Sequence, residues 1–344
     1  MTRDVTVRGA GVFGLAIAWA CQRRGARVQV IDPAGVAAGA SGGIVGALAP
    51  HVPEQWNAKK AFQLDSLLAS EAFWGEIETA SDRPTGYART GRLQPLADAG
   101  AVAMAQARAA GAARLWQGRA VWRVTDAPVG PLVPHSATGL WVEDTLSARI
   151  HPRDACTALA EALRRGGARI GRDGADEGAV IWATGWRGLQ ALTERHSRQV
   201  GVGVKGQAAL LGFEARGASQ VFAGGLHLVP HHDGTVAVGS TTERDFDAET
   251  ATDGQLDALI AAAREMVPAL AEAPTLARWA GVRPRSRSRA PMLGAHPFEP
   301  GAFVANGGFK IGFGMAPGVA EVMADLVLEG LDRIPDAFRV ETCL

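Results

Sequence analysis

The first residues of the chain alternate short apolar runs with polar breaks. Residues 5–7 predict a β-strand, the apolar positions of residues 15–24 predict an α-helix, and residues 27–32 predict a second, fully buried strand. Two buried strands joined through a helix lie parallel in one sheet. The pattern therefore predicts an α/β fold that opens with a βαβ unit.

Helical and extended patterns alternate along the rest of the chain. Helices are predicted over residues 59–79, 97–115, 152–165, 253–266 and 317–329. Strands are predicted over residues 180–182, 202–211, 220–229, 235–239, 278–282 and 303–305, with a hairpin turn at Asp233 and Gly234. The concentration of strands between residues 200 and 240 indicates a second, β-rich region.

Composition and charge bound the class of protein. The 344 residues are 47% hydrophobic and 20% charged, which is typical of a globular protein with about two structural units. Lys and Arg number 35, as do Asp and Glu, so a general nucleic-acid or polybasic membrane binder is not expected. Three widely spaced cysteines favour a reduced, cytoplasmic protein without a zinc site, and no apolar run reaches a membrane span.

A glycine-rich motif follows the first predicted strand. Gly9 permits a tight turn, Gly11 lets a pyrophosphate approach the backbone, and Gly14 lets the helix pack on the strand. The free N–H groups at the helix start favour phosphate, and Asp32 at the end of the second strand is placed to accept hydrogen bonds from a ribose. The unit predicts dinucleotide binding and leaves NAD and FAD both open.

An ordered set of further motifs follows this unit. The set comprises residues 39–41, 46–50, 150–152, 183–186, 227–230, 233–234, 238–241, 281–284, 291–294, 307–312 and 316–317. With these motifs the chain resembles the FAD-dependent D-amino acid oxidase family, which includes glycine oxidase, sarcosine oxidase and D-amino acid dehydrogenases. The resemblance favours FAD over NAD.

The resemblance implies an α/β fold in which an FAD/NAD(P)-binding Rossmann-like domain is interleaved with an α+β substrate domain built on a mixed β-sheet. The FAD-binding domain would comprise residues 1–80, 140–199 and 276–344. The substrate domain would comprise residues 81–139 and 200–275. No cysteine lies between residues 283 and 294, where sarcosine oxidases attach their flavin, so non-covalent FAD is expected.

The resemblance also implies which residues bind the cofactor. They lie in the glycine motif, the small-residue loop, the stretch around residue 184 and the turn before the last helix. The expected set is Gly9, Gly11, Val12, Phe13, Gly14, Asp32, Pro33, Ala40, Ser41, Val45, Gly46, Ala47, Ala183, Thr184, Gly185, Trp186, Gly308, Phe309, Lys310, Ile311 and Gly312.

The implied reaction is oxidation of the C–N bond of an amino acid or secondary amine to an imine, with hydride transfer to flavin N5. Arg283 matches the arginine that holds the substrate carboxylate, and a planar bidentate fork suits that task. Lys310 and the N-terminus of the last helix are expected to stabilise negative charge on the flavin. Arg283, His227 and Lys310 are the expected catalytic residues, and all three are also expected to bind the substrate. His51 is expected near the flavin and the substrate.

Two departures from the family pattern matter. His227 stands where the family usually has a substrate-binding tyrosine, and it is expected to bring pH dependence near neutrality. Arg283, Arg285, Arg287 and Arg289 form a basic run, which predicts extra negative charge on the substrate or on a docking partner. His231 and His232 are expected in a turn rather than in a metal site.

Two other functions stay open at this point. One is a flavin oxidase that acts on a modified tRNA wobble uridine, and the other is a flavin-bound protein with vestigial activity. The sequence does not decide between oxygen and a quinone or other carrier as electron acceptor. It also leaves open the oligomeric state and the choice among glycine, D-, L- and N-methyl amino acids.

Overall fold

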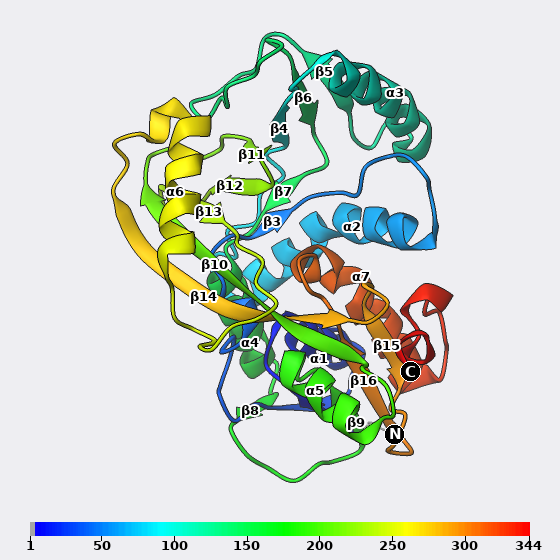
Figure 1. Ribbon diagram of the computed structural model, residues 1–344. Helices are drawn as coiled ribbons and strands as arrows, with labels where there is room; N and C mark the ends of the chain where they lie inside the picture. The colour runs from blue at the N-terminus through cyan, green and yellow to red at the C-terminus, as the bar shows by residue number, and fades with distance from the viewer. Residues whose placement is uncertain (1–3) are drawn as a thin grey trace.

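The computed structural model describes residues 4–344 and contains two main β-sheets with helices packed around them (Figure 1). The first sheet has the order β15-β16-β9-β1-β2-β8, and its strands are parallel except for β15 against β16. Its strands are β1 (Asp4–Arg8), β2 (Arg27–Ile31), β8 (Arg169–Gly171), β9 (Ala179–Trp182), β15 (Met292–Ala295) and β16 (Ala302–Asn306).

The second sheet has the order β14-β10-β13-β12-β11-β4-β6-β5 and is mixed, because β11 and β4 run parallel while their neighbours are antiparallel. Its strands are β4 (Arg92–Pro95), β5 (Trp122–Thr125), β6 (Trp141–Asp144), β10 (Gly201–Gly212), β11 (Gln220–Ala223), β12 (Leu226–Pro230), β13 (Thr235–Gly239) and β14 (Thr275–Ser286). The short pair β3 (Ala47–Leu48) and β7 (Ala148–Arg149) stands apart.

The helices are α1 (Val12–Arg23), α2 (Ala58–Ser81), α3 (Ala99–Trp116), α4 (Pro152–Arg165), α5 (Gly185–Arg195), α6 (Gly254–Met266) and α7 (Gly312–Ala324). Helix α1 packs between the first sheet, α4 and α7, and is buried from Val12 to Cys21. In Figure 1 the long strands β10 and β14 run from the second sheet towards the first, where α5 lies against them. Among residues 4–344, no helix combines the length and apolarity needed to cross a bilayer.

Most predicted elements are confirmed, including the opening βαβ unit. The predicted strand over residues 220–229 is wrong, because Gly224 and Gly225 both take positive φ and divide it into the hairpin β11–β12. The last long helix begins at Gly312, not at Pro317, which lies inside it. The short strands β3–β8 and β15 were not predicted from the sequence, because their apolar runs are too short to show a period. Helix α5 was not predicted either.

The division into domains stays a proposal. Strands β6 and β14 belong to the second sheet by their hydrogen bonding, although the predicted boundaries at residues 140 and 276 would place most of both in the FAD-binding part. Taking the sheets as the units, we propose that residues 141–144 and 275–286 belong with the substrate part.

Candidate active site

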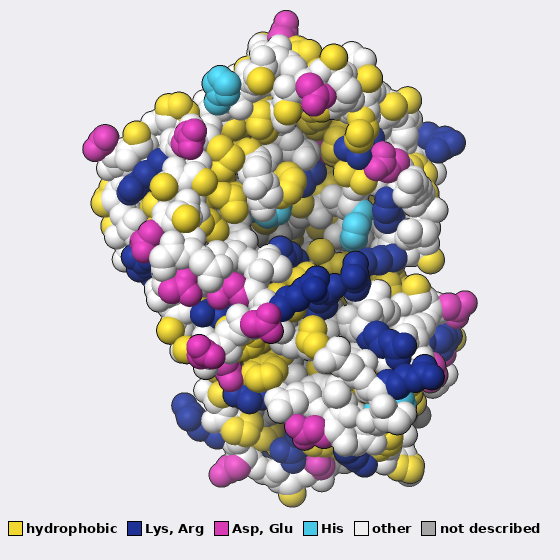
Figure 2. All heavy atoms as spheres, in the orientation of Figure 1, with side chains coloured by type: hydrophobic (Ala, Val, Ile, Leu, Met, Phe, Trp, Pro, Cys, Tyr) yellow, Lys and Arg dark blue, Asp and Glu magenta, His cyan; other side chains and the backbone are white. Residues whose placement is uncertain are grey.

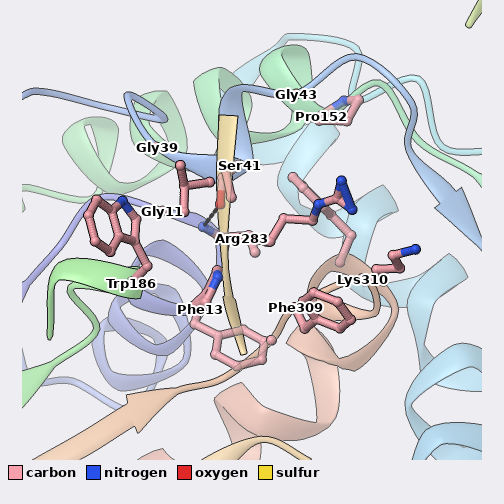
Figure 3. A pocket seen from close by; sticks show the side chains of 18 of the residues that line it. Gly11, Phe13, Gly39, Ser41, Gly43, Pro152, Trp186, Arg283, Phe309 and Lys310 are labelled. Carbon is pink, nitrogen blue, oxygen red and sulfur yellow. Dashed lines mark hydrogen bonds between the residues drawn. The ribbon is translucent and has the colours of Figure 1, made fainter. Parts of the chain in front are cut away.

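A cavity of about 760 Å³ lies between the two sheets (Figure 3). One end is formed by the β1–α1 turn and the end of β2, and the other by β12, β13 and β14. Seventeen of the predicted cofactor residues line it: Gly11, Val12, Phe13, Asp32, Ala40, Ser41, Val45, Gly46, Ala47, Ala183, Thr184, Gly185, Trp186, Gly308, Phe309, Lys310 and Gly312. The other four, Gly9, Gly14, Pro33 and Ile311, do not line the cavity.

The glycine motif determines the conformation of the turn between β1 and the first residues of α1. Gly9 has φ +112°, and a Cβ there would lie 2.3 Å from the carbonyl oxygen of Ala183. A Cβ on Gly14 would lie 1.9 Å from the carbonyl oxygen of Gly9. Both glycines are therefore needed for packing of the turn on its neighbours, while Gly11 is the one that faces the cavity.

The start of α1 offers backbone N–H groups to the cavity. The hydroxyl of Ser41 accepts a hydrogen bond from the amide of Val12 at 2.9 Å, and the following N–H groups of the first turn have no partner within the helix. Asp32 accepts hydrogen bonds from the amides of Ala10 at 2.8 Å and Ala34 at 3.0 Å. These contacts fix its carboxylate at the cavity wall.

Small residues leave room for an extended ligand along this wall. A Cβ on Gly39 or on Gly185 would meet nothing within 4 Å, so the backbone there faces open space. A dinucleotide needs N–H donors for its phosphates and an acceptor for its ribose hydroxyls. The exposed backbone, the N-terminus of α1 and the Asp32 carboxylate supply these groups. The residues present therefore fit the predicted cofactor.

Arg283 lies in the opposite end of the cavity. It comes from β14, its exposed fraction is 7%, and Figure 3 shows its guanidinium directed into the space above Phe309. Nη2 donates to the carbonyl oxygen of Thr241 at 2.8 Å, and Nη1 donates to Ser240 Oγ at 3.3 Å. Burial lowers the pKa of Arg283 to about 10, so the group is charged at neutral pH.

A buried polar network lies behind this arginine. Glu243 pairs with Lys205 at 3.4 Å, and both side chains are buried. Glu243 also accepts hydrogen bonds from Thr241 and Gln207, and Gln207 donates in turn to Asp253 at 2.9 Å. Because the Thr241 carbonyl holds Arg283, this network fixes the direction of the guanidinium.

His227 lines the cavity on β12 and packs against Phe222, with ring centroids 4.7 Å apart. Burial, with the charges of Arg92 and Lys310, lowers its pKa to about 3. The expected titration near neutrality is therefore wrong, because the ring is neutral there. Its Nδ1 is buried and has no protein partner.

Lys310 and Phe309 close the same end. Lys310 Nζ donates to Thr242 Oγ1 at 3.0 Å, and burial followed by repulsion from Arg283 lowers its pKa. Phe309 has φ +42°, a strained conformation for a residue with a side chain, and its amide donates to the carbonyl of Pro284 at 3.1 Å. The strained turn places the Phe309 ring beneath Arg283.

His51 does not line the cavity. Its amide and its Nδ1 both contact Gln63 Oε1, which ties the loop before α2 to that helix. Burial lowers the pKa of His51. The structure gives His51 a partner within the protein, and its role toward flavin or substrate stays a prediction.

Sequence reasoning missed several residues of the site. Ser240 and Thr241 belong to a motif of the resemblance but carried no predicted role, and Glu243, Lys205 and Trp279 were not singled out at all. Their positions depend on how β10, β13 and β14 pair, which no local pattern reveals. The sequence offered one signal for this network, which is the acidic residue Glu243 directly after the motif that contains Ser240 and Thr241.

Comparison with known proteins agrees with this geometry. A family model described as "DAO: FAD dependent oxidoreductase" matches residues 4–326. Glycine oxidase of Geobacillus kaustophilus (strain HTA426) is 26% identical over 94% of this chain and 92% of that protein. Glycine oxidase of Pseudomonas aeruginosa is 35% identical, but the match covers only 34% of this chain and 32% of that enzyme.

A solved structure has the same fold. The crystal structure of glycine oxidase from Geobacillus kaustophilus superposes with a TM-score of 0.81 over 98% of this chain and 99% of that one, at 21% identity.

Proposed function

The chain belongs to the DAO family of FAD-dependent oxidoreductases, and on that premise we propose that it oxidises the C–N bond of an amino acid or secondary amine to an imine. It is thus an enzyme with FAD as cofactor. The class of substrate and the roles of individual residues are the proposal.

The first end of the cavity would hold the cofactor. The N–H groups at the start of α1, beside Gly11 and Ser41, would bind the pyrophosphate, and Asp32 would accept hydrogen bonds from a ribose. The N-terminal turn of α7 at Gly312 and Phe313 also lines the cavity and offers its free N–H groups to a developing negative charge.

The second end would hold the substrate. When bound, FAD supplies a ring that accepts the hydride equivalent from the substrate. Arg283 would bind the carboxylate with two parallel N–H donors and so fix the direction of the Cα–H bond. The free Nδ1 of His227 is available to hydrogen-bond the substrate, and the positive charges of Arg283 and Lys310 favour the uncharged amine over the ammonium.

One observation carries this proposal above the others. The side chain of Arg283 is 7% exposed and faces the cavity, and among residues 4–344 its hydrogen-bond acceptors are one hydroxyl and one carbonyl. A buried cation with neutral partners is costly unless an anion joins it. An α-carboxylate is the anion that an amine oxidoreductase would present there.

The test is an anaerobic screen of the purified FAD-loaded enzyme. Glycine, sarcosine and D- and L-amino acids are mixed in turn with the protein, and loss of the visible flavin absorption is followed. We expect at least one amine to bleach the flavin rapidly. Admission of air then separates an oxidase, whose colour returns, from an enzyme that needs a quinone or carrier. If no amine bleaches the flavin, the proposal is wrong.

A further inference from the structure

Three cationic side chains surround the ring of Phe309. The guanidinium carbon of Arg283, that of Arg285, and Lys310 Nζ lie 5.9, 5.9 and 5.8 Å from the ring centroid. Figure 2 shows Lys and Arg side chains in a band beside a hollow in the middle of this face. Arg283 and Lys310 line the cavity itself, and Arg285 follows two positions along the same face of β14.

Glu243 favours the charged form of Arg283 through space, but no carboxylate in the described part of the chain forms an ion pair with any of the three groups. Within residues 4–344, Arg283 and Lys310 bond only to hydroxyl and carbonyl oxygens, and neither they nor Arg285 form an ion pair. The arrangement therefore leaves an excess of positive charge at one end of the cavity.

The nearby carboxylates are engaged elsewhere. Glu243 is paired with Lys205, and Asp253 is bonded to Gln207 on the far side of that pair. Glu249 lines the cavity but bonds to Arg187, and Asp32 is held by backbone amides at the other end. Within residues 4–344, Arg283, Arg285 and Lys310 thus have no carboxylate as an ion-pair partner, and two of them, Arg283 and Lys310, line the cavity.

We propose that this site takes an amine that carries two carboxylates, one bound by Arg283 and the other by Lys310. The inference rests on the proposed function and adds the class of substrate to it. A monocarboxylic amine would neutralise Arg283 and leave Lys310 without an anion. A second carboxylate supplies that anion within the same cavity, and a charge-assisted hydrogen bond results.

The rest of the basic run does not extend the site. Arg287 donates to the carbonyl oxygen of Leu344 at 2.9 Å, and Arg289 is exposed in the turn after β14, where its carbonyl accepts from Lys59 at 2.8 Å. Three cationic residues line the cavity, and Arg187 is paired there with Glu249. The positive charge without an ion-pair partner in this lining therefore comes from Arg283 and Lys310. This favours a small dianionic substrate over a docking partner.

Pairs of substrates that differ only by a carboxylate provide the test. D-aspartate is compared with D-alanine, and iminodiacetate with sarcosine, by anaerobic flavin reduction in the FAD-loaded enzyme. We expect the dicarboxylate of a pair to have a kcat/KM about 10- to 100-fold higher, which corresponds to one added hydrogen bond between charged groups. Equal or lower values for both dicarboxylates would overturn the inference and leave the proposed function standing.

Variants of Lys310 assign the second carboxylate. In Lys310→Met the ratio of the two kcat/KM values within a pair is expected to fall at least tenfold, and Lys310→Arg is expected to restore most of it. Lys60→Met is the control, because Lys60 donates to the carbonyls of Val52 and Glu54 outside the cavity. The ratio of the two kcat/KM values in this variant should equal that of the parent enzyme. If Lys310→Met slows both members of a pair equally, Lys310 acts on the reaction and the inference is wrong.

A binding measurement separates this inference from a failure of catalysis. Succinate and propionate, which have no amine, are titrated into the FAD-loaded enzyme and the shift of the flavin spectrum is followed. Succinate is expected to bind at least tenfold more tightly than propionate, and Lys310→Met is expected to remove that difference. This binding comparison tests the inference independently of catalysis. It can therefore be read even if no amine bleaches the flavin, a result that would refute the proposed function.

Discussion

At the scale of single residues, the proposal depends on one guanidinium. Arg283→Met removes the fork and keeps a side chain of similar length. Hydrogen bonds to charged groups contribute about 1.5–3 kcal/mol each, so kcat/KM for a carboxylate substrate should fall by about 100-fold or more. Steady-state kinetics measure this, with Arg289→Met as the control because Arg289 is exposed outside the cavity. Equal losses in both variants would contradict the assigned role.

Two of the histidines whose pKa is lowered, His227 and His231, predict a pH dependence of stability. Burial lowers the pKa of His227 to about 3 and that of His231 to about 4, below the ordinary value of 6.5. As the pH falls below 6.5, the unfolded chain binds protons that the folded state does not. The free energy of unfolding should therefore fall by about 2 kcal/mol for each ring between pH 8 and pH 5.

Urea unfolding at several pH values measures this loss. His227→Gln should remove about half of it, whereas His135→Gln should leave the pH dependence as it is, because the His135 side chain is exposed. A parent protein equally stable at pH 8 and pH 5 would show that these rings are not held neutral.

The buried pair behind Arg283 predicts a stability effect. In Glu243→Gln the charge of Lys205 stays buried without its direct partner, and the expected loss is about 3 kcal/mol in the free energy of unfolding. Glu299→Gln breaks the exposed pair with Arg195 and should cost less than about 1 kcal/mol. Urea unfolding of both variants provides the comparison, and similar losses would count against a structural network at Glu243.

At the scale of elements, the start of α1 separates two kinds of glycine. A methyl group on Gly11 would enter the cavity 3.1 Å from Ser41 Oγ, so Gly11→Ala should weaken FAD binding about tenfold or more while the apoprotein loses under about 1 kcal/mol of stability. Gly14→Ala should instead cost about 1–3 kcal/mol of stability, because its methyl meets the carbonyl of Gly9.

Fluorescence titration of the apoprotein with FAD and urea unfolding measure the two effects. The control is Gly75→Ala in α2, where an added Cβ meets nothing within 4 Å. That variant should bind FAD normally and gain about 0.5–1 kcal/mol from helix propensity. Weak FAD binding in Gly75→Ala would mean that the assay reports general damage.

Elements with strong local signals were predicted well, and elements set by distant pairing were not. The βαβ unit was found because the spacing of Gly9, Gly11 and Gly14 and the terminal Asp32 are local requirements of one turn. The start of α7 was missed because Pro317 looked like a first helical residue. The five residues before it, 312–316, include two glycines and no polar side chain, and they form the first part of the helix through packing against α1 and α2.

The same division holds for the site. Arg283 was identified through a motif, but its support by Glu243 and Lys205 follows from the antiparallel pairing of β10 with β14 and from the bridge between Lys205 and Glu243. A one-residue change of register would turn these side chains to the opposite face. The sequence alone does not specify that register, so the network became visible only in the structure.

At the scale of the whole molecule, the cavity is shared by the two sheets. Gly11 and Asp32 come from the first sheet and its turn, while His227 and Ser240 come from the second. A ligand that contacts both sheets should stabilise them together, by about 2.7 kcal/mol at a concentration 100 times its Kd.

Hydrogen exchange with and without FAD tests this coupling. Backbone amides of α1 and of β13 should both exchange more slowly when FAD is present, although the two elements lie in different sheets. Amides of α3, which lines no part of the cavity, serve as the reference. Slowing confined to α1 would show that the ligand does not connect the two halves.

The face of β10 beneath Arg283 has one further consequence. Gly206 carries no side chain there, and a Cβ at this position would lie 1.3 Å from Nη2 of the arginine. The guanidinium therefore rests directly on a neighbouring main chain, and any larger residue at position 206 would tilt it further out into the cavity. A substitution of Gly206 would thus change how far the Arg283 guanidinium extends into the cavity. The length of substrate that fits would change with it, although the arginine itself is kept.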